Sequence, residues 1–559
     1  MTKNKTLRIG LLIKPDLKIT RWQQDILDRI SSISSNIHIV VAYYDTACTK
    51  PQRKTSWSKK LWLFLTRLEG KVSFLLSGGA GRCAGLRNDI SDFYPDIALE
   101  GIKTDASASG LVRFVPQDKV HEIQALDLDV ILNFGWGIIK GDILVAAKYG
   151  ILSYHHADNR INRGSPPGFW EWYYKQPHTG VTLQKLTDDL DNGEVIRRGL
   201  YKTQTWSWSA NYRHACWASR FLMSDSVHVL YLNGCLTAVP EDDSVLDFYS
   251  QRLFVAPKFR EQLLAGFKLI LRYAVHFWTK LLVNTARCDY WSLLFFRGSM
   301  KKLSARKAIE LKPPAGHFWA DPFVVEQEDS TYIFVEDWVY ETQKGRISVL
   351  TVENSRVVDN QVALDCPYHL SYPFVFKYGN AFYMIPETHK NNTIELWRCK
   401  SFPNEWEKDI VLMNDVCASD TTLTLYDGKW WMFTNIARGK PAFTGYELHI
   451  FYTDDPVKGK WKPHALNPVV TNSKIARMGG HLYMDDQKLF RVSQESNMRY
   501  GEGVVVHEVC ELTPFSYKEV TRESVKPHWA ADLVGIHHIS YSKHYTVMDV
   551  CRRKWKWRV

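Results

Sequence analysis

The sequence lacks the closely spaced cysteine pairs that a disulfide framework or a structural zinc site requires. Its ten cysteines are scattered from Cys48 to Cys551, and no two of them form a CxxC pair. Small secreted scaffolds and zinc ribbons both depend on such pairs. We therefore predict neither architecture, and no metal site.

Long uninterrupted hydrophobic runs are also missing. The first residues, MTKNKTLRIGLLIKPD, show no signal-peptide core and no small-residue cleavage site, so we expect a cytoplasmic protein. The longest apolar helix candidate, 263–283, contains Lys268, Arg272 and Lys280, which is untypical of a membrane span. The surrounding segment 258–285 is amphipathic and basic. We interpret it as an interdomain element, with peripheral membrane contact as the alternative.

Acidic residues are fewer than basic ones, giving a formal net charge of +11. Basic stretches lie at 50–60 and 552–558, and such stretches can meet phosphate groups or form solvated faces. No RNA-binding or helix-turn-helix signature accompanies them, so we do not predict a nucleic-acid partner.

The chain has 559 residues, which is too long for a single core. In the first part, short apolar runs at 7–13, 37–44 and 129–135 alternate with helical patterns such as 19–33. This alternation predicts an α/β domain with a doubly wound, mainly parallel sheet. In such sheets ligands bind at the carboxyl ends of the strands, where HHADN (155–159) falls.

The second part has short alternating strands and a unit that returns about every fifty residues. The units are HFWADPFVV (317–325), HLSYPFVF (369–376), CASDTTLTL (417–425), IARMGGHLY (475–483) and HWAADLVGI (528–536). Five such units predict an all-β five-bladed propeller, with a β-sandwich as the alternative. The predicted division is 1–250 for the α/β domain, 251–300 for a helical basic connector and 301–559 for the propeller.

An ordered set of motifs lies within 150–196 and resembles the formyltransferases that act on methionyl-tRNA, glycinamide ribonucleotide and sugars. The matching positions are Gly150, His155, Arg163-Gly164, Pro167, Gly180-Val181-Thr182 and Asp191-x-Gly193. The resemblance implies formyl transfer from 10-formyltetrahydrofolate to an amine, with His155 and Asp191 as the catalytic pair.

The sequence departs from that family two residues before His155, where the family's Asn is Ser153. By the resemblance, that Asn donates a hydrogen bond to the developing oxyanion. A serine hydroxyl can also donate, but loss of such a donor can cost roughly a hundredfold to a thousandfold in rate. The residues that we consider as compensating or substrate-binding groups are His156, Asp158, Asn159, Asn162 and Arg163. The aromatic run 169–174 either lines the pocket or packs as a helix on the sheet.

The second half resembles the propellers of arabinanase- and invertase-type glycoside hydrolases and the N-terminal domain of plant glucosamine inositolphosphorylceramide transferase. The residues that carry this likeness are ADPFVV (320–325), SYPFVF (371–376), MIPET (384–388) and ARMGG (476–480). The predicted sugar-binding or catalytic carboxylates, which recur in the repeated units, are Asp321, Glu387, Asp420 and Asp532. Each of these carboxylates could instead stabilise a turn by accepting hydrogen bonds from backbone amides.

Two hypotheses for the function follow from these resemblances. The first is formyl transfer to an amino sugar, free or linked to a nucleotide, in surface polysaccharide assembly, with a propeller that binds carbohydrate. The second is a propeller glycoside hydrolase or glycosyltransferase beside a degenerate formyltransferase-like domain, or a carbohydrate-binding scaffold without activity. Ser153 favours the second hypothesis.

Overall fold

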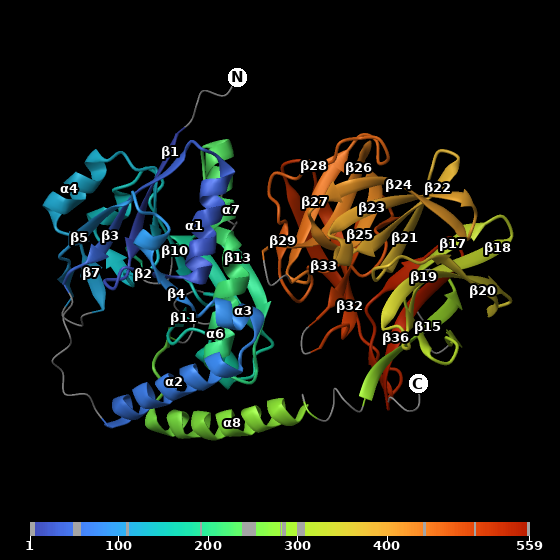
Figure 1. The fold of residues 1–559 in the computed structure, drawn as a ribbon, viewed down its shortest axis with the longest axis horizontal. Helices are drawn as coiled ribbons and strands as arrows, with labels where there is room; N and C mark the ends of the chain where they lie inside the picture. The colour runs from blue at the N-terminus through green and yellow to red at the C-terminus, as the bar shows by residue number, and fades with distance from the viewer. Residues whose placement is uncertain are drawn as a thin grey trace. The chain divides into compact units, whose positions relative to one another are not determined.

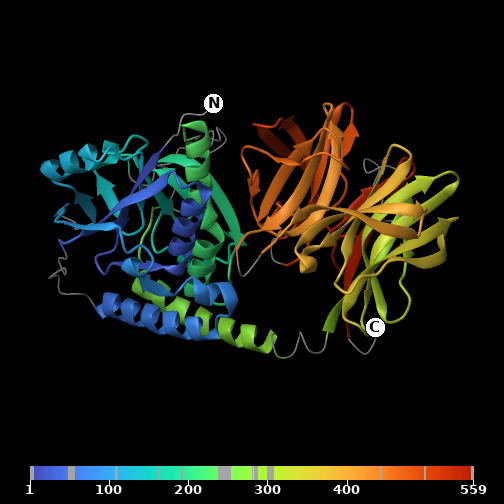
Figure 2. The same ribbon diagram turned by 45° about the horizontal axis from the view of Figure 1, so that its top comes forward.

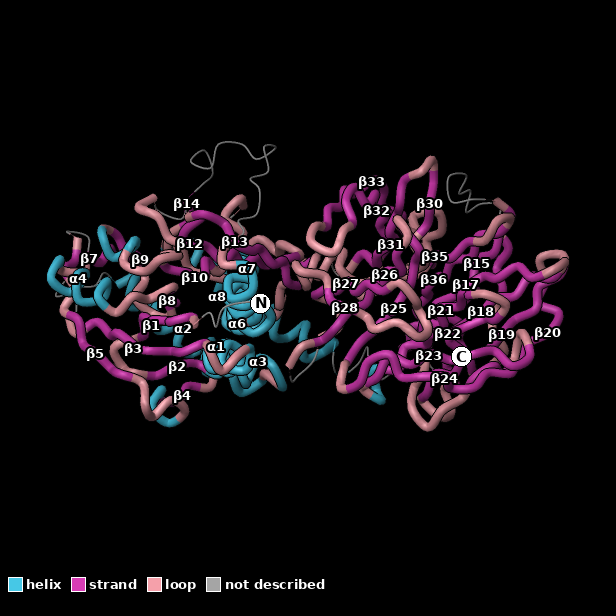
Figure 3. Tube along the Cα trace, turned by 90° about the horizontal axis from the view of Figure 1, so that it is seen from above, coloured by secondary structure: helices cyan, strands magenta, loops and turns pink. Residues whose placement is uncertain are grey.

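A computed structural model describes residues 6–47, 57–107, 111–161, 163–189, 193–236, 253–279, 281, 287–298, 308–439, 443–496 and 499–555. The chain divides into two compact units, unit 1 at 1–276 and unit 2 at 277–559 (Figure 1). Unit 1 mixes helices with strands, whereas unit 2 is built mainly of strands and loops (Figure 3).

Unit 1 is organised around a seven-stranded sheet in the order β13-β12-β10-β8-β1-β3-β5. The strands of this sheet are β1 (Leu7–Ile13), β3 (Ile37–Asp45), β5 (Ala98–Ile102), β8 (Val130–Asn133), β10 (Ile151–His155), β12 (His178–Lys185) and β13 (Glu194–Lys202). The five strands from β10 to β5 are parallel, and β12 and β13 run antiparallel at one edge. The predicted mainly parallel sheet is confirmed.

Helices cover both faces of this sheet, and a separate apolar core fills each face. The helices of unit 1 are α1 (Arg21–Ile33), α2 (Trp57–Leu76), α3 (Gly79–Cys83), α4 (Gln117–Ala125), α5 (Phe169–Tyr173), α6 (Trp208–Ser219), α7 (Phe221–Asn233) and α8 (Phe259–Trp278), the last of which continues into unit 2. The short strands are β2 (Lys18–Thr20), β4 (Arg87–Asp89), β6 (Asp105–Ala106), β7 (Val112–Phe114), β9 (Ile138–Lys140), β11 (Arg163–Gly164) and β14 (Leu253–Phe254).

Local sequence explains where α1 begins and which side of it is buried. The Gln23 side chain accepts a hydrogen bond from the Thr20 backbone N–H at 2.9 Å, which satisfies a donor at the helix start. Trp22, Ile26 and Ile30 are four residues apart, so they share one face, and all three are buried. This packing fixes the chain beside the carboxyl end of β1.

Unit 2 contains four antiparallel meanders that follow one another along the chain. They are β17 (His317–Gln327) to β20 (Arg356–Leu364), β21 (Ser371–Tyr378) to β24 (Glu405–Asn414), β25 (Cys417–Tyr426) to β29 (Val470–Thr471), and β30 (Tyr483–Asp485) to β33 (Tyr517–Val525). Their inner members are β18 (Ser330–Val339), β19 (Lys344–Glu353), β22 (Ala381–Thr388), β23 (Thr393–Ser401), β26 (Lys429–Ala437), β27 (Glu447–Thr453), β28 (Lys462–Pro463), β31 (Lys488–Glu495) and β32 (Gly503–Leu512).

A further sheet joins the two ends of unit 2. Here β15 (Arg287–Arg297) pairs along its whole length with β36 (Tyr545–Trp555). The sheet also contains β16 (Ile309–Leu311), β34 (Leu533–Gly535) and β35 (Ile539–Tyr541). The sheet is therefore made from the first and last strands that the structure describes in this unit.

No helix in the described ranges is both long and apolar enough to cross a membrane.

Candidate functional sites

A cavity of about 600 Å³ opens at the carboxyl ends of the central strands of unit 1. Its lining includes Lys14 after β1, Asn133 at the end of β8, and Ser153 and His155 on β10. Carboxyl ends of neighbouring parallel strands meet at one edge of a sheet, so residues far apart in sequence come together here. The structure thus places two of the three predicted catalytic residues in one cavity.

Ser153 has a partner that the sequence reasoning missed. Ser153 lies beside Asn133 in the parallel register, and the Asn133 Nδ2 donates to the Ser153 Oγ at 3.3 Å. The Asn133 Oδ1 accepts from the backbone N–H groups of Gly135 and Trp136 at 3.1 and 3.0 Å. The amide orientation is therefore fixed, and the Asn133 Nδ2 supplies a side-chain amide donor next to the position where the formyltransferases have their own Asn.

The two adjacent histidines have different environments. His155 is half-buried and faces Thr182 across the antiparallel pairing of β10 with β12. The ring of His156 packs edge-on against Trp22 and Tyr212, at centroid distances of 5.8 and 5.2 Å. Burial lowers the pKa of His156 to about 3, so this ring stays neutral. Since His156 packs within this aromatic cluster, His155 is the better candidate for proton transfer.

The remaining predicted residues of unit 1 do not join this group. Asp158 forms a two-point ion pair with Arg160, with contacts of 3.0 and 2.8 Å. Asn159 is buried, 3.4 Å from Arg198, and neither Asp158 nor Asn159 is among the described residues that line the cavity. Asp191, Asn162 and the Arg163 side chain lie outside the described residues.

The aromatic run 169–174 forms the short helix α5, which is the packing alternative. Phe169 and Trp172 are fully buried in a cluster with Trp62 of α2 and Trp208 of α6. None of these four residues is among those that line the cavity. We therefore assign this run to the core of unit 1 and not to ligand stacking.

A second cavity, of about 250 Å³, lies in unit 2 and is lined by several of its sheets. Its polar lining includes Asp321 of β17, Glu336 of β18, Glu387 of β22, Arg477 and His537. Aromatic side chains form other parts of its wall, namely Trp291, Phe318, Trp338 and Tyr500. Phe318 and Trp338 stack with their planes only 1° apart. Flat aromatic surfaces beside carboxylates suit a sugar ring.

The repeated unit of the sequence forms the same backbone feature in three successive sheets. The pairing register shifts at Asp321, Tyr372 and Asp420, and these residues have φ values of 49°, 45° and 53°. Non-glycine residues in this region are strained, and such strain is concentrated at functional sites. In the first and third sheets the bulged residue is a buried aspartate.

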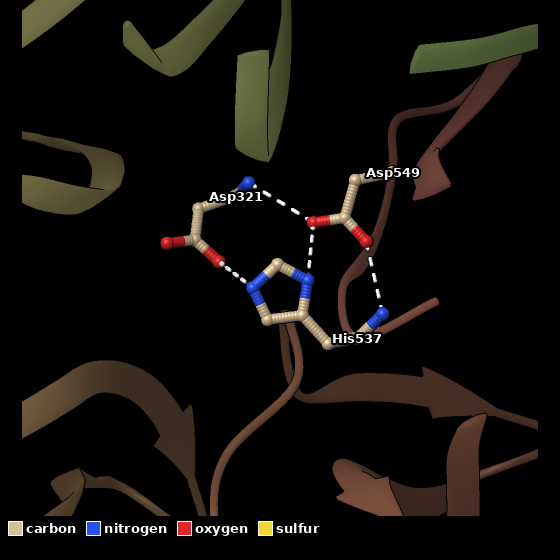
Figure 4. Close-up of side chains that lie close together, drawn as sticks. All are labelled: Asp321, His537 and Asp549. Carbon is tan, nitrogen blue, oxygen red and sulfur yellow. Dashed lines mark hydrogen bonds and ion pairs between the residues drawn. The ribbon is translucent and has the colours of Figure 1, made fainter. Parts of the chain in front are cut away.

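Asp321 and His537, which line this cavity, form an ionic triad with Asp549 (Figure 4). The His537 Nε2 lies 3.3 Å from the Asp321 Oδ1, and the His537 Nδ1 lies 2.7 Å from the Asp549 Oδ2. Burial lowers the pKa of His537, but the two carboxylates outweigh that effect and raise it above the usual value. The three donor groups lie within 4.8 Å of one another and could hold a cation. However, a metal requires a neutral imidazole, whereas this geometry favours a protonated one.

The carboxylates that line the cavity of unit 2 have opposite protonation preferences. Burial would raise the pKa of Asp321, but His537 and His538 hold it at about 2. Burial raises the pKa of Glu336 far above its usual range, and the charges of Asp321 and Glu387 raise it further. One ionised and one protonated carboxyl group therefore face the same cavity.

Glu387 and Asp420 lie next to Arg477. Burial raises the pKa of Glu387, but His389, 2.5 Å away, and Arg477 bring it below the usual value. Burial raises the pKa of Asp420 to about 7 against the opposing charge of Arg477, with which Asp420 forms a short ion pair. Three of the four predicted carboxylates of unit 2, Asp321, Glu387 and Asp420, are thus linked to one buried network.

Asp532 is not part of this network. Its side chain is 64% exposed and pairs with Arg552 at 2.6 Å. It precedes β34, and it is His537, after that strand, that lines the cavity. Sequence similarity to the ADPF unit therefore aligned the wrong residue.

Sequence reasoning also missed Glu336, although a signal for it was present. Glu336 pairs across its sheet with Ala320, and Glu387 pairs in the same way with Ser371. Alignment of IFVED (333–337) with MIPET (384–388) would have placed Glu336 at the same site as Glu387.

Comparison with known proteins associates unit 2 with a plant transferase. Residues 305–543 match the family model of the N-terminal part of glucosamine inositolphosphorylceramide transferase 1. The glucosamine inositolphosphorylceramide transferase 1 of Oryza sativa subsp. japonica is 37% identical over 213 residues, which cover 36% of this chain and 28% of the relative. The chain therefore spans little more than a quarter of that relative's length.

Two weaker similarities were also found. The methionyl-tRNA formyltransferase of Bacillus cytotoxicus is 25% identical over 154 residues, which cover 26% of this chain and 49% of the relative. The solved catalytic domain of the Coprinopsis cinerea GH62 α-L-arabinofuranosidase aligns with a TM-score of 0.34 at 9% identity, covering 47% of this chain and 97% of that domain. The similarity to the plant transferases, which was expected from the sequence, is confirmed. Formyl transfer from tetrahydrofolate has no support from these relatives beyond distant likeness.

Proposed function

We propose that the sheets of unit 2 are five propeller blades and that their shared cavity is a glycosyl-handling site, which cleaves or transfers a sugar at its glycosidic bond. The observation that carries this proposal is the pair Asp321 and Glu336, which are ionised and protonated, respectively, in one cavity. Carboxyl groups whose environments push their pKa values apart can act as base and acid at neutral pH.

In the proposed reaction, Glu336 gives its proton to the leaving glycosidic oxygen as the bond from that oxygen to the anomeric carbon breaks. Asp321 then takes the proton of the water or hydroxyl group that forms the new bond to this carbon, or attacks the carbon itself. Phe318 and Trp338 would stack on the sugar ring. Arg477 would keep the carboxylates of Glu387 and Asp420 in position through its ion pairs.

The chemical identity of the sugar is the finer part of the proposal. The name of the plant relatives contains glucosamine and a transferase activity, which supports a hexosamine as the glycosyl unit. Since this chain covers only 28% of the rice protein, the activity of the whole relative comes to this chain only as a proposal.

The test uses the full chain with nitrophenyl hexosaminides and nucleotide-linked hexosamines as substrates. Glu336→Gln and Asp321→Asn should each lower turnover by about a hundredfold or more. The matched control is Asp532→Asn, which changes an exposed aspartate of the same unit and should leave turnover unchanged. Sugar binding without turnover in the wild type would refute catalysis and identify a binding scaffold.

A second candidate function belongs to unit 1. We propose acyl transfer there, of formyl or a related group, to an amino sugar, because Asn133, Ser153 and His155 face one cavity. The donor set fits an acyl group that develops negative charge, and 10-formyltetrahydrofolate would supply the one-carbon unit. Asn133 and Ser153 would donate to the oxygen, and His155 would take the amine proton.

Titration of the full chain with 5-formyltetrahydrofolate tests this second function. Binding that is weakened in His155→Ala would support it. Absence of binding to the wild type would mean that unit 1 has lost the folate site, while the proposal for unit 2 would stand.

A further inference from the structure

Helices α2 and α8 lie side by side on one surface of unit 1 (Figures 1 and 2). Trp62 of α2 and Ala265 of α8 enter the same buried aromatic cluster, which fixes both helices to the unit. We propose that their outer surface, defined below as the α2/α8 face, binds the surface of an anionic lipid bilayer.

Helix α2 is amphipathic in the inverse sense to an ordinary surface helix. Its buried positions include Glu69 and Ser73, and Glu69 accepts short hydrogen bonds from Ser207 and Ser209. Large apolar side chains point outward instead. These are Trp57, Phe64, Leu68, Val72 and Leu75, which are 79%, 61%, 49%, 36% and 70% exposed. Successive members lie three, four or seven residues apart, so they form one stripe on the side of the helix that faces away from Glu69 and Ser73.

Helix α8 has the same arrangement. Two of its cations face the protein: Arg272 donates to the Trp172 carbonyl oxygen at 2.6 Å, and Lys268 donates to the Tyr173 carbonyl oxygen at 3.3 Å. These cations satisfy the C-terminal end of α5. The outward side chains are Leu263, Phe267, Ile270 and Leu271, which are 54%, 68%, 72% and 54% exposed. The α2/α8 face consists of these four residues and the five outward residues of α2.

Nine large apolar side chains exposed on two neighbouring helices are more than a soluble protein normally exposes in one region, and they indicate a binding surface. The charged residues beside the α2/α8 face indicate which kind of partner binds it. Lys60, Arg67 and Lys71 of α2 are exposed on one flank of the stripe, whereas Glu69 is buried. Cations beside an apolar stripe suit an interface where lipid headgroups carry negative charge. A second copy of the same face would bring these cations against one another.

In the bound state, the apolar stripe enters the boundary between headgroups and acyl chains, and the lysine and arginine side chains reach outward to the phosphates. Unit 1 would then lie on the membrane without spanning it. This inference is independent of the reaction proposed for either unit.

The test is flotation of the full chain with two kinds of vesicle, equimolar phosphatidylcholine and phosphatidylglycerol or phosphatidylcholine alone. The wild type should float with the mixed vesicles and much less with the neutral ones. The double variant Phe64→Glu/Ile270→Glu should lower the partition coefficient by at least about tenfold, since it places charge in the apolar stripe. Lys60→Glu/Lys71→Glu should remove the preference for anionic vesicles.

The matched control is Phe515→Glu, which changes a 75% exposed phenylalanine of unit 2 and should float like the wild type. The melting temperature of each variant establishes that it is folded. Failure of the wild type to bind mixed vesicles would overturn the proposal, as would wild-type flotation of a folded Phe64→Glu/Ile270→Glu variant. If the wild type does not bind vesicles but is a dimer in light scattering, and the Phe64→Glu/Ile270→Glu variant is a monomer, the α2/α8 face binds a second copy of the chain instead.

Discussion

Substitution of Asp549 by asparagine tests the ionic triad of unit 2. Asp549 accepts hydrogen bonds from the backbone N–H groups of Asp321, His537 and His538 at 3.1, 2.9 and 3.0 Å. It also contacts the His537 Nδ1 at 2.7 Å. In the variant, one acceptor oxygen becomes an NH₂ group that faces donors, so at least one buried donor loses its acceptor.

The expected loss of stability follows from these contacts. A buried donor without a partner costs about 1–3 kcal/mol, and removal of one partner of a buried ion pair costs about 3–5 kcal/mol. We expect Asp549→Asn to lower the free energy of unfolding of unit 2 by about 3–5 kcal/mol. At about 2–4 °C per kcal/mol, the melting temperature should fall on the order of 10 °C.

The effect should depend on pH in a defined direction. The folded-state pKa of His537 lies above its unfolded value, so its contribution is fully present below the unfolded pKa and is lost as the pH rises through the folded pKa. Asp549→Asn removes the larger source of that rise, so the difference in melting temperature between wild type and variant should shrink on the alkaline side.

Differential scanning calorimetry of the full chain between pH 5 and pH 9 measures both quantities. Asp532→Asn is the matched control, because it removes a surface partner of Arg552 and should change the melting temperature little. A loss below about 1 kcal/mol for Asp549→Asn, or a difference that grows at alkaline pH, would refute the reasoning.

Three further predictions concern other parts of the molecule. Arg491 is fully buried and forms two 2.7 Å contacts with Glu519, so Arg491→Met should cost about 3–5 kcal/mol in chemical denaturation, and this cost should shrink as the pH falls, because protonation of Glu519 removes the ion pair from the wild type. Asn133→Ala should weaken the binding of 5-formyltetrahydrofolate to the unit 1 cavity in titration calorimetry, while Ser153→Asn should preserve or strengthen it. Equal affinity of the wild type and both variants would show that no side-chain amide donates to the ligand there. Limited proteolysis should cleave within 251–316 and leave two fragments that keep their secondary structure in circular dichroism, because each unit has its own core.

The strand pattern of unit 1 was predictable because its signals are local. The runs predicted at 7–13 and 37–44 correspond to β1 and β3, and the helical pattern at 19–33 corresponds to α1. Near-continuous apolar strands and apolar residues at i, i+4 spacing can be recognised without knowledge of their tertiary partners.

The site residues were only partly predictable, since they depend on pairings between distant strands. Asn133 became visible only when β8 was placed beside β10. Glu336 required the register of β17 with β18, and Asp549 required β36 to return to β15. Asp532 was selected by a local sequence match, but it precedes β34 and its exposed side chain pairs with Arg552 and not with the cavity residues.

Helix α2 shows a different limit. The basic stretch at 50–60, whose last residues begin α2, is open from the sequence alone to two interpretations, phosphate contact or a solvated face. Amphipathicity alone does not state which face of a helix points to the protein. That assignment came from the buried positions of Glu69 and Ser73.

The pairing of β15 with β36 has a consequence for biosynthesis. The ribosome synthesises β15 long before β36, so β15 cannot form this pairing until the end of the chain has emerged. Unit 1, which precedes β15, can already fold during that time. Because Asp549 lies on β36, the same late event that closes this sheet also completes the environment of Asp321. A nascent chain stalled before residue 545 would therefore present an unpaired strand edge and an unfinished acidic site together, which makes that intermediate the natural substrate for chaperones and proteases.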